Sequence, residues 1–213
     1  MILASRQPVT LIGGGPLADQ DLAQALALAP TVAAADGGAD TALAQGLIPQ
    51  AVWGDFDSIS ERARQAIPAD RLHRIAEQDS TDFEKCLTRI RAPLVIAIGF
   101  SGARQDHFLA ALTTLARRIG PPTILLAGED AITLAPPRIA LDLPVHTRLS
   151  LYPMGAASGC STGLAWPIDG IAFAPDRRTG TSNRSTGPVT LEIQGPMLLI
   201  LPRAQLMDLA RSL

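Results

Sequence analysis

The sequence is poor in cysteine and carries no large excess of charge of either sign. Two cysteines, Cys86 and Cys160, are too few for a disulfide framework, so we expect two reduced thiols in a cytoplasmic protein. The chain has 18 Lys and Arg residues and 20 Asp and Glu residues, which gives a formal net charge of −2. This balance argues against a nucleic-acid partner, although a local basic patch could still hold a single phosphate group.

Long apolar runs are also missing. The first residues, MILASRQPVTLIGGG, contain no apolar run long enough for a signal peptide, and no stretch reaches the length that crosses a membrane. We therefore expect a soluble, cytoplasmic protein. Hydrophobic residues make up 47% of the 213 positions and charged residues 18%, which is typical of a globular protein with a packed core.

The first half of the chain alternates short apolar runs with helical patterns. Strands are predicted at 9–15, 31–40 (running into a Gly-Gly turn), 51–56, 93–100 and 122–128, and helices at 17–29, 41–46, 80–92 and 106–120. The apolar strands are continuous rather than alternating and helices separate them, which indicates a parallel sheet covered on both faces. The sequence thus predicts a Rossmann-like α/β domain over residues 1–128.

After about residue 128, proline, glycine and short alternating runs replace this pattern. Closely spaced strands are predicted at 131–136, 138–143, 147–154, 163–168, 171–175, 189–195 and 197–202, and only 204–213 has a helical pattern. Short strands with turn residues between them favour an antiparallel β-sandwich. Residues 129–213 are therefore predicted to form a second domain.

The segment GGGPLA, residues 13–18, fits the loose dinucleotide-binding pattern G-x-G-x-x-A. Asp36 ends the second predicted strand, where such a protein keeps the acid that binds the ribose. One hypothesis is therefore an NAD-dependent oxidoreductase that uses Gly13, Gly15 and Asp36. The pattern is weak by itself, because an ordinary glycine turn explains it equally well and the backbone amides could hold a phosphate of any nucleotide.

Asp36 also begins the cluster AADGGAD, residues 34–40. Gly37 and Gly38 let the backbone turn sharply and let a ligand approach it closely. In open parallel sheets, ligands bind beyond the carboxyl ends of the strands. The alternative is that these residues only make a turn.

Asp55 and Asp57 stand two residues apart in WGDFDS, residues 53–58. Two carboxylates so close raise each other's pKa unless a cation or several donors compensate. In an extended segment both would point to one side and Phe56 to the other, which suits a Mg²⁺ site of hard oxygen ligands, and Gly54 would allow close approach. An Asx-type turn without a metal is the alternative.

Asp82 and Lys85 in DSTDFEK, residues 79–85, share one face of a predicted helix. An acid beside a lysine at a helix N-terminus could bind a metal and a phosphate together. Helix capping by Asp79 or Ser80 also explains the segment without any chemistry.

Arg104 lies in the glycine loop of GFSGARQDHFLAAL, residues 99–112. Its guanidinium could grip phosphate oxygens through two parallel hydrogen bonds. Asp106 and His107 could instead form a hydrogen-bonded structural pair at the start of the helix.

These polar clusters share one expected location. Four of the five end separate predicted strands or open the helix beside them, so a doubly wound topology would bring them to one edge of the sheet. The set contains carboxylates, cations and glycine loops but no Ser, Cys or His triad pattern. Such a set favours Mg²⁺-assisted handling of a nucleotide polyphosphate.

In their order and spacing, the motifs resemble the thiamine pyrophosphokinase family. The resemblance rests on AADGGAD, GDFDS, DSTDFEK, GFSGARQDH, STGLAWP and GTSNRS, and it covers nearly the whole chain. It implies Mg²⁺-dependent transfer of a diphosphate from ATP to thiamine, which gives thiamine diphosphate and AMP. It also implies an N-terminal α/β domain for ATP and Mg²⁺, a C-terminal β-sandwich for thiamine, and a homodimer with shared active sites.

The resemblance implies a role for each residue that matches a family motif. Catalytic carboxylates would be Asp36, Asp55, Asp57 and Asp82, the last three as Mg²⁺ ligands. Contacts to ATP or its phosphates would come from Gly37, Lys85, Ser101, Arg104, Asp106 and His107, and contacts to thiamine from Gln78, Trp166, Ser182 and Asn183. An indole face would attract the cationic, flat thiamine ring, while Ser and Asn would bond its aminopyrimidine. Alternatively, Trp166 is a core aromatic and GTSN a turn.

Two positions depart from the family pattern. Ala103 stands where the family commonly has a second glycine before the arginine, and the segment after His107 lacks an asparagine often found there. The Cβ of Ala103 is expected to restrict the loop and so to alter its contact with the nucleotide.

Two other classes of protein remain open. One is a non-catalytic module that binds thiamine or a nucleotide, and the other is the oxidoreductase, which would leave Asp55, Asp57 and Asp82 without a role.

Overall fold

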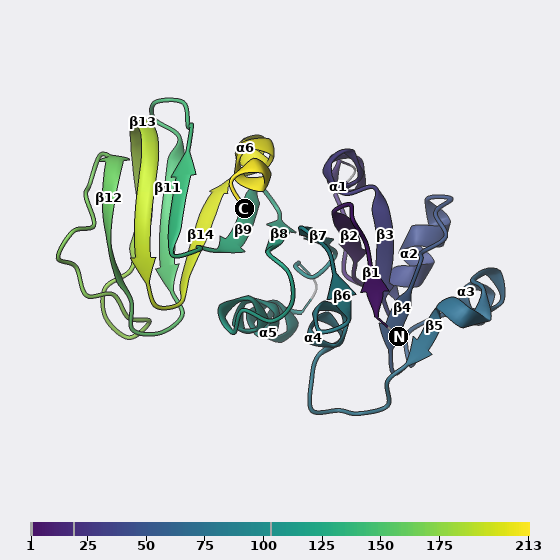
Figure 1. The fold of residues 1–213 in the computed structure, drawn as a ribbon. Coiled ribbons are helices and arrows are strands. Elements are labelled where there is room, and N and C mark those ends of the chain that lie inside the picture. The colour runs from purple at the N-terminus through teal and green to yellow at the C-terminus, as the bar shows by residue number, and fades with distance from the viewer. Residues whose placement is uncertain (1, 19, 103) are drawn as a thin grey trace. The chain divides into compact units, whose positions relative to one another are not determined.

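The computed structural model describes residues 2–18, 20–102 and 104–213, so Ala103 lies outside the described residues. The chain divides into two compact units, Met1–Gly128 and Glu129–Leu213. The first combines parallel strands with helices and the second is made mainly of antiparallel strands (Figure 1). The expected order of an α/β part followed by a β part is confirmed. In the described part of the chain, no helix is long and apolar enough to cross a membrane.

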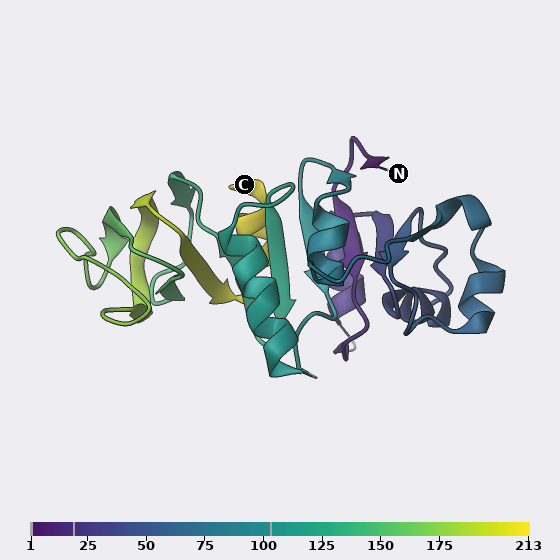
Figure 2. The same ribbon diagram turned by 90° about the horizontal axis from the view of Figure 1, so that it is seen from below.

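The N-terminal unit is built on parallel strands. β2 (Val9–Ile12), β7 (Val95–Ile98) and β8 (Thr123–Ala127) pair in that order, and β3 (Thr31–Ala35), β4 (Val52–Gly54) and β5 (Leu72–Arg74) pair in a second set. Figures 1 and 2 show β2 and β3 side by side. A short pair, β1 (Leu3–Ala4) with β6 (Ile90–Arg91), is also parallel. The carboxyl ends of β2, β3, β4 and β7 lead into the loops that carry the candidate site.

The helices of this unit are short. They are α1 (Asp21–Leu28), α2 (Gly38–Ala44), α3 (Glu61–Ala66), the 3₁₀ turn Ala69–Arg71, α4 (Asp82–Leu87) and α5 (Gln105–Ala116). α2 and α3 pack on one face of β3 and β4 through a buried cluster that includes Ala34, Val52 and Ala63. Hydroxyl caps start two of them: Ser60 accepts from the Ala63 N–H and Thr81 from the Glu84 N–H. Thr81 therefore caps α4, not Asp79 or Ser80.

Several short elements of this unit are absent from the sequence prediction. α3, β5 and the β1–β6 pair have two to six residues each, too few for a hydrophobic period to be recognised. The helix predicted at 80–92 ends at Leu87, and Ile90 and Arg91 form β6 instead.

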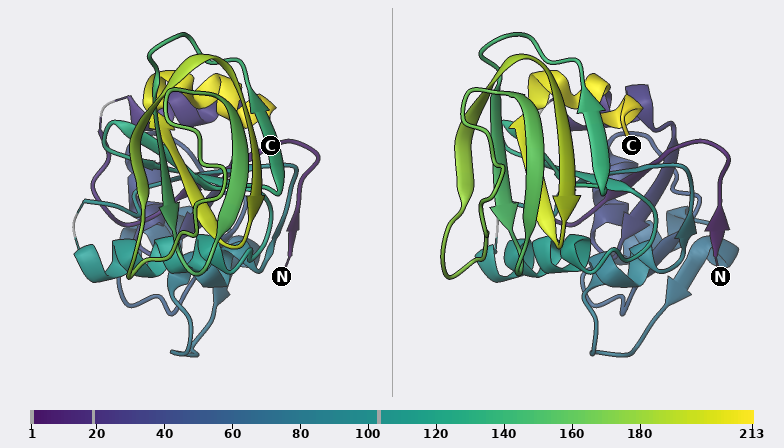
Figure 3. Two further views of the ribbon diagram at one scale, coloured as in Figure 1. Left: turned by 90° about the vertical axis from the view of Figure 1, so that its left-hand side faces the viewer. Right: turned by 60° about the vertical axis from the view of Figure 1, so that its left-hand side comes forward.

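The C-terminal unit is a set of antiparallel strands followed by a helix (Figure 3). Its strands are β9 (Asp130–Leu134), β10 (Arg138–Leu141), β11 (Arg148–Pro153), β12 (Ser158–Leu164), β13 (Gly180–Gln194) and β14 (Met197–Pro202), and α6 (Leu206–Arg211) ends it. β14 pairs with β9 on one side and with β11 on the other, and β11 also pairs with the first part of β13. The later part of β13 pairs with β10 and β12. The antiparallel character is confirmed, whereas the sandwich packing stays a prediction.

The strands predicted at 163–168 and 171–175 are wrong for most of their length. β12 begins at Ser158 and ends at Leu164, and the second segment contributes a single bridge between Phe173 and Ala157. Proline removes ladder donors in both segments, at Pro167 and Pro175. The strand pairing is made instead by the polar run SGCSTGL, which forms β12, and by the 15-residue β13.

Candidate active site at the strand ends

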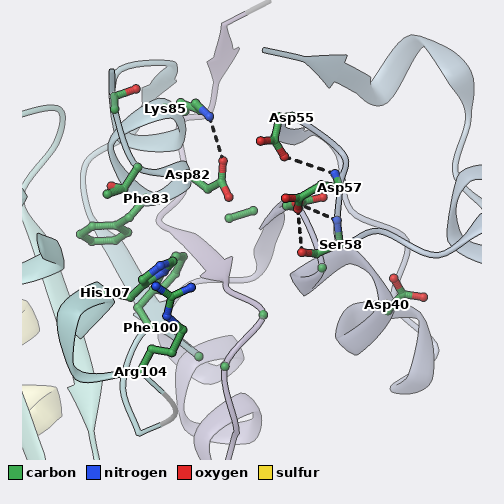
Figure 4. Close-up of a pocket in the computed structure, with 18 of the residues that line it drawn as sticks. Asp40, Asp55, Asp57, Ser58, Asp82, Phe83, Lys85, Phe100, Arg104 and His107 are labelled. Carbon is green, nitrogen blue, oxygen red and sulfur yellow. Dashed lines mark hydrogen bonds and ion pairs between the residues drawn. The ribbon is translucent and has the colours of Figure 1, made fainter. Parts of the chain in front are cut away.

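A pocket of about 780 Å³ lies at the carboxyl ends of the parallel strands in the N-terminal unit. Its walls come from the segments after β2, β3, β4 and β7 and from the first turns of α4 and α5 (Figure 4). Most of the predicted site residues line it: Asp36, Gly37, Asp55, Asp57, Gln78, Asp82, Lys85, Ser101, Arg104 and His107. Asp106 is not among the described lining residues, and Trp166, Ser182 and Asn183 belong to the C-terminal unit.

Three carboxylates meet in this pocket. Asp36, Asp55 and Asp57 each offer an oxygen, and these oxygens lie within 4.8 Å of one another. The segment that carries Asp55 and Asp57 is not extended, because Phe56 has a φ of 67° and the Asp57 N–H donates to Asp55 Oδ1 across 3.2 Å. The extended geometry predicted for it is therefore wrong. An Asx-type turn brings the carboxylates together, so the turn and the acidic cluster coexist.

Asp36 is the buried member of the cluster. Only 4% of it is exposed, its Oδ2 accepts from the Ser58 N–H across 3.2 Å, and its buried Oδ1 has no hydrogen-bond partner among the residues described. Burial, and next the Asp57 carboxyl that can share a proton with it, raise the pKa of Asp36 to about 6. Among the residues described, this buried carboxylate therefore has no cation beside it.

Gly54 allows the ends of β3 and β4 to approach each other closely. A Cβ on Gly54 would lie 2.7 Å from the Cβ of Asp36, closer than real Cβ atoms come to a neighbour. Glycine at this position is therefore required for Asp36 to stand beside the segment that carries Asp55 and Asp57.

Asp82 and Lys85 form an ion pair on α4. Lys85 Nζ lies 3.2 Å from Asp82 Oδ1, with 3% of the lysine side chain and 36% of the aspartate side chain exposed. Burial raises the pKa of Asp82, while the hydrogen bond from Lys85 lowers it. Figure 4 shows the Asp82 carboxylate between Lys85 and the other acids. Asp82 is not part of the close group of carboxylates. The group contains Asp36 as its third member, where the sequence predicted Asp82 as the third metal ligand.

The arginine of the glycine loop is paired with the acid that opens α5. Arg104 donates from its terminal nitrogen to Asp106 Oδ2 across 2.6 Å, and both side chains are about two-thirds exposed. Asp106 therefore has Arg104 as its side-chain partner in place of the pairing with His107 that the sequence allows. Exposed ion pairs contribute little stability, so this guanidinium can exchange its partner for an incoming anion.

Four further residues of the pocket are ones to which the sequence assigned no role. The rings of Phe83 and Phe100 pack with centroids 4.6 Å apart, and Asp40 accepts from the Ser60 N–H across 2.9 Å. All four line the pocket. Asp40 and Ser60 are 20 positions apart and join only through the fold, so no local pattern could have found them.

Two of the predicted thiamine contacts are coupled in the C-terminal unit. Trp166 is 57% exposed, which excludes the alternative of a core aromatic, and Arg184 lies over its ring at 5.4 Å. The Asn183 amide donates to the Trp166 carbonyl across 2.6 Å and accepts from the Trp166 N–H across 3.2 Å. Ser182 and Asn183 lie in β13, so GTSN is not a simple turn. Asn183 thus fixes the backbone of Trp166.

Comparison with known sequences agrees with the geometry of the pocket. Residues 22–123 match a family described as "Thiamin pyrophosphokinase, catalytic domain". Thiamine pyrophosphokinase 1 of Oryza sativa subsp. japonica is 27% identical over 154 residues, which cover 63% of this chain and 58% of that protein. Thiamine pyrophosphokinase of Bacillus subtilis (strain 168) is 40% identical over 87 residues, 38% of this chain and 40% of that protein. The matches therefore span less than two thirds of these relatives.

Solved structures share the fold over nearly the whole chain. Thiamin pyrophosphokinase from Candida albicans superposes with a TM-score of 0.77 at 15% identity and covers 94% of this chain and 93% of that one. Thiamin pyrophosphokinase from Geobacillus thermodenitrificans gives 0.75 at 22% identity, with 92% and 97% covered. At these identities the likeness shows a common fold of an α/β part and a β part.

Proposed function

Residues 22–123 belong to the thiamin pyrophosphokinase family, and from this premise we propose that the chain transfers a diphosphate group from ATP to thiamine, giving thiamine diphosphate and AMP. The observation that carries the proposal is the group of Asp36, Asp55 and Asp57 in one pocket with Lys85 and Arg104. Carboxylates for a metal and cations for phosphate oxygens are what phosphoryl-type transfer requires.

The carboxylate group fits a divalent metal ion. Asp36 has a buried oxygen without a hydrogen-bond partner among the residues described, and burial, followed by the neighbouring Asp57 carboxyl, raises its pKa to about 6. Hard oxygen ligands at this spacing suit Mg²⁺. We assign the ion to Asp36, Asp55 and Asp57, where it would neutralise phosphate oxygens of ATP. Asp82, a metal ligand in the sequence prediction, is assigned to the thiamine hydroxyl and to Lys85.

The chain's own groups can divide the remaining work. The hydroxyl oxygen of thiamine attacks the β-phosphorus of ATP, and the bond from that phosphorus to the oxygen bridging to the α-phosphate breaks, so AMP leaves. Lys85 and Arg104 would hold the phosphate oxygens. A primary alcohol has a high pKa, so its proton is expected to move late, to a carboxylate such as Asp82, whose pKa burial raises.

The thiamine ring needs a flat, exposed aromatic surface to stack on. Trp166 offers a more exposed surface of this kind than the described aromatic residues of the N-terminal pocket do. We propose that Trp166 stacks on thiamine, that Ser182 and Gln78 contact it, and that Asn183 acts by holding Trp166. We further propose the homodimer with shared sites and the sandwich packing of the C-terminal strands, which the family resemblance implies.

A coupled assay for AMP tests the proposal. Purified protein is given ATP and Mg²⁺ with and without thiamine, and then EDTA. Thiamine-dependent AMP that disappears on chelation is the expected result. ADP in place of AMP would contradict diphosphate transfer, and neither product, with thiamine still bound in calorimetry, would indicate a binding module. A change in NADH fluorescence on adding the protein would revive the oxidoreductase, which leaves the three carboxylates unused.

A further inference from the structure

The loop between β4 and α3, residues 55–60, carries two of the three clustered carboxylates in an uncommon backbone conformation. We call these residues the acidic loop. Phe56, between Asp55 and Asp57, has a φ of 67°. Residues with bulky side chains avoid this left-handed region, because Cβ comes too close to the backbone. Something outside the loop must therefore hold Phe56 in place.

Arg64 of α3 holds Phe56 at two points. Its terminal nitrogen donates to the Phe56 carbonyl oxygen, and its guanidinium carbon lies 5.8 Å from the centroid of the Phe56 ring. A planar guanidinium can donate in its plane and attract a ring with its face, so one side chain restrains both ends of one residue. Phe56 itself packs against the core under α2 and α3.

The neighbouring backbone groups of the acidic loop are held as well. Arg74 of β5 donates from Nε to the Asp55 carbonyl across 3.1 Å, and Asp40 of α2 accepts from the Ser60 N–H across 2.9 Å. Between these two fixed ends, the rotation at Phe56 decides where the Asp57 side chain points relative to that of Asp55. Arg64 is thus placed to set the spacing of the carboxylates without touching them.

We propose that Arg64 is a positioning residue for the divalent-metal site, and that it acts through Phe56. If Phe56 moved to the extended region, the turn in which the Asp57 N–H donates to Asp55 Oδ1 would open. The oxygens that now lie within 4.8 Å would separate. The inference rests on the proposed function only for the presence of a metal at this group.

Binding of Mn²⁺ alone, in the absence of ATP and thiamine, tests the inference on the full chain. Free Mn²⁺ is followed by electron paramagnetic resonance for the unsubstituted protein, Arg64→Ala, Arg64→Lys and Arg62→Ala. Arg62 is a matched control, because it is exposed on the same helix. We expect Arg64→Ala to raise the Mn²⁺ dissociation constant about 10-fold or more, as loss of an outer support does at metal sites. Arg64→Lys should restore part of the affinity, since an ammonium can make one of the two contacts.

Melting temperatures measured in EDTA separate positioning from general stability. Arg64→Ala is expected to melt close to the unsubstituted protein without metal, because its side chain is exposed. Equal Mn²⁺ affinity in Arg64→Ala and Arg62→Ala would overturn the inference and leave the proposed function standing. A loss of metal-free stability large enough to account for the weaker binding would overturn it too. No Mn²⁺ binding by the unsubstituted protein would overturn the inference and the assignment of the ion to these carboxylates alone, while AMP release still decides the proposed function.

Discussion

Lys85 is almost fully buried and has Asp82, one turn earlier on α4, as its ion-pair partner 3.2 Å away. A buried ammonium needs such a partner, and a half-exposed carboxylate needs the ammonium less. The lysine thus lies in the pocket, where phosphate oxygens can replace Asp82 as its partner. The pair is therefore suited to binding ATP, and it makes Lys85 the first cation to test.

Replacing Lys85 by methionine should lower kcat/KM for ATP by about 10²- to 10³-fold, the usual cost of losing one preorganised group that stabilises oxygen charge. The change also leaves Asp82 without its partner, which should raise the pKa of that carboxyl further. Steady-state kinetics with varied ATP measures the effect. Arg117→Met is the matched control, because Arg117 pairs with Glu84 of the same helix outside the pocket. Similar losses in both variants would contradict a specific role of Lys85.

Replacing Asp57 by alanine should abolish turnover with little loss of folding. Asp57 is exposed, so its removal leaves no cavity, and it relieves repulsion between like charges in the group of three carboxylates. AMP release and the melting temperature in EDTA are the two measurements. Asp70→Ala, at an exposed aspartate outside the pocket, should change neither. Near-normal AMP release by Asp57→Ala would show that the metal assignment is wrong.

Replacing Asp36 by asparagine should stabilise the metal-free protein, and more so as pH rises. The folded protein raises the pKa of Asp36 from 3.8 to about 6, so between these values the folded state keeps a proton that the unfolded chain has lost. Stability of the unsubstituted protein then falls as pH rises through this window, and the Asn variant lacks this loss. The difference in melting temperature should therefore be small near pH 4 and largest above about pH 6. A constant difference across this range would contradict the raised pKa.

The main strands of the N-terminal unit, and the sheet edge where the pocket lies, could be predicted from particular runs of sequence. VTLI, TVAAA, VWG and VIAI are apolar segments that polar or glycine clusters follow directly, so parallel pairing had to bring Asp36, Asp55 and Ser101 to one edge. The identity of the third close carboxylate could not be predicted. It depends on positive φ angles at Asp36 and Phe56 and on the bare Cα of Gly54, and each of these is set by tertiary contacts.

The polar strand β13 shows a second limit. Its residues Asn183 and Ser185 are buried because they bond to backbone groups: Asn183 to Trp166, and Ser185 to Thr147 and Pro144. A hydropathy pattern treats such residues as surface or turn, so GTSNRS gives no strand signal. The same bonds make Asn183 a support of Trp166 rather than a free polar contact.

Replacing Asn183 by alanine should raise the KM for thiamine and leave the KM for ATP unchanged. Without the amide, the Trp166 N–H and carbonyl lose their partner and the exposed indole is no longer fixed. An aromatic stack is worth about 0.5–1.5 kcal/mol, so the KM for thiamine should rise by up to about tenfold. The ATP KM measured on the same preparation is the internal control. An equal rise in both KM values would indicate general damage to the fold.

Replacing Gly54 by alanine should weaken both folding and metal binding. Its Cβ would lie 2.7 Å from Asp36 Cβ and 3.1 Å from Asp36 Cγ, and β4 is paired on both sides, so neither strand end can move away freely. Overpacking of this kind costs about 1–3 kcal/mol, which urea unfolding can resolve. Gly14→Ala is the matched control, because its nearest contact would be an ordinary 3.7 Å and neither glycine has a left-handed backbone. If Gly54→Ala unfolds at the same urea concentration as Gly14→Ala and binds Mn²⁺ equally well, the close approach of Gly54 to Asp36 does not shape the site. If only Gly54→Ala loses Mn²⁺ affinity, the spacing between β3 and β4 sets the position of the buried carboxylate.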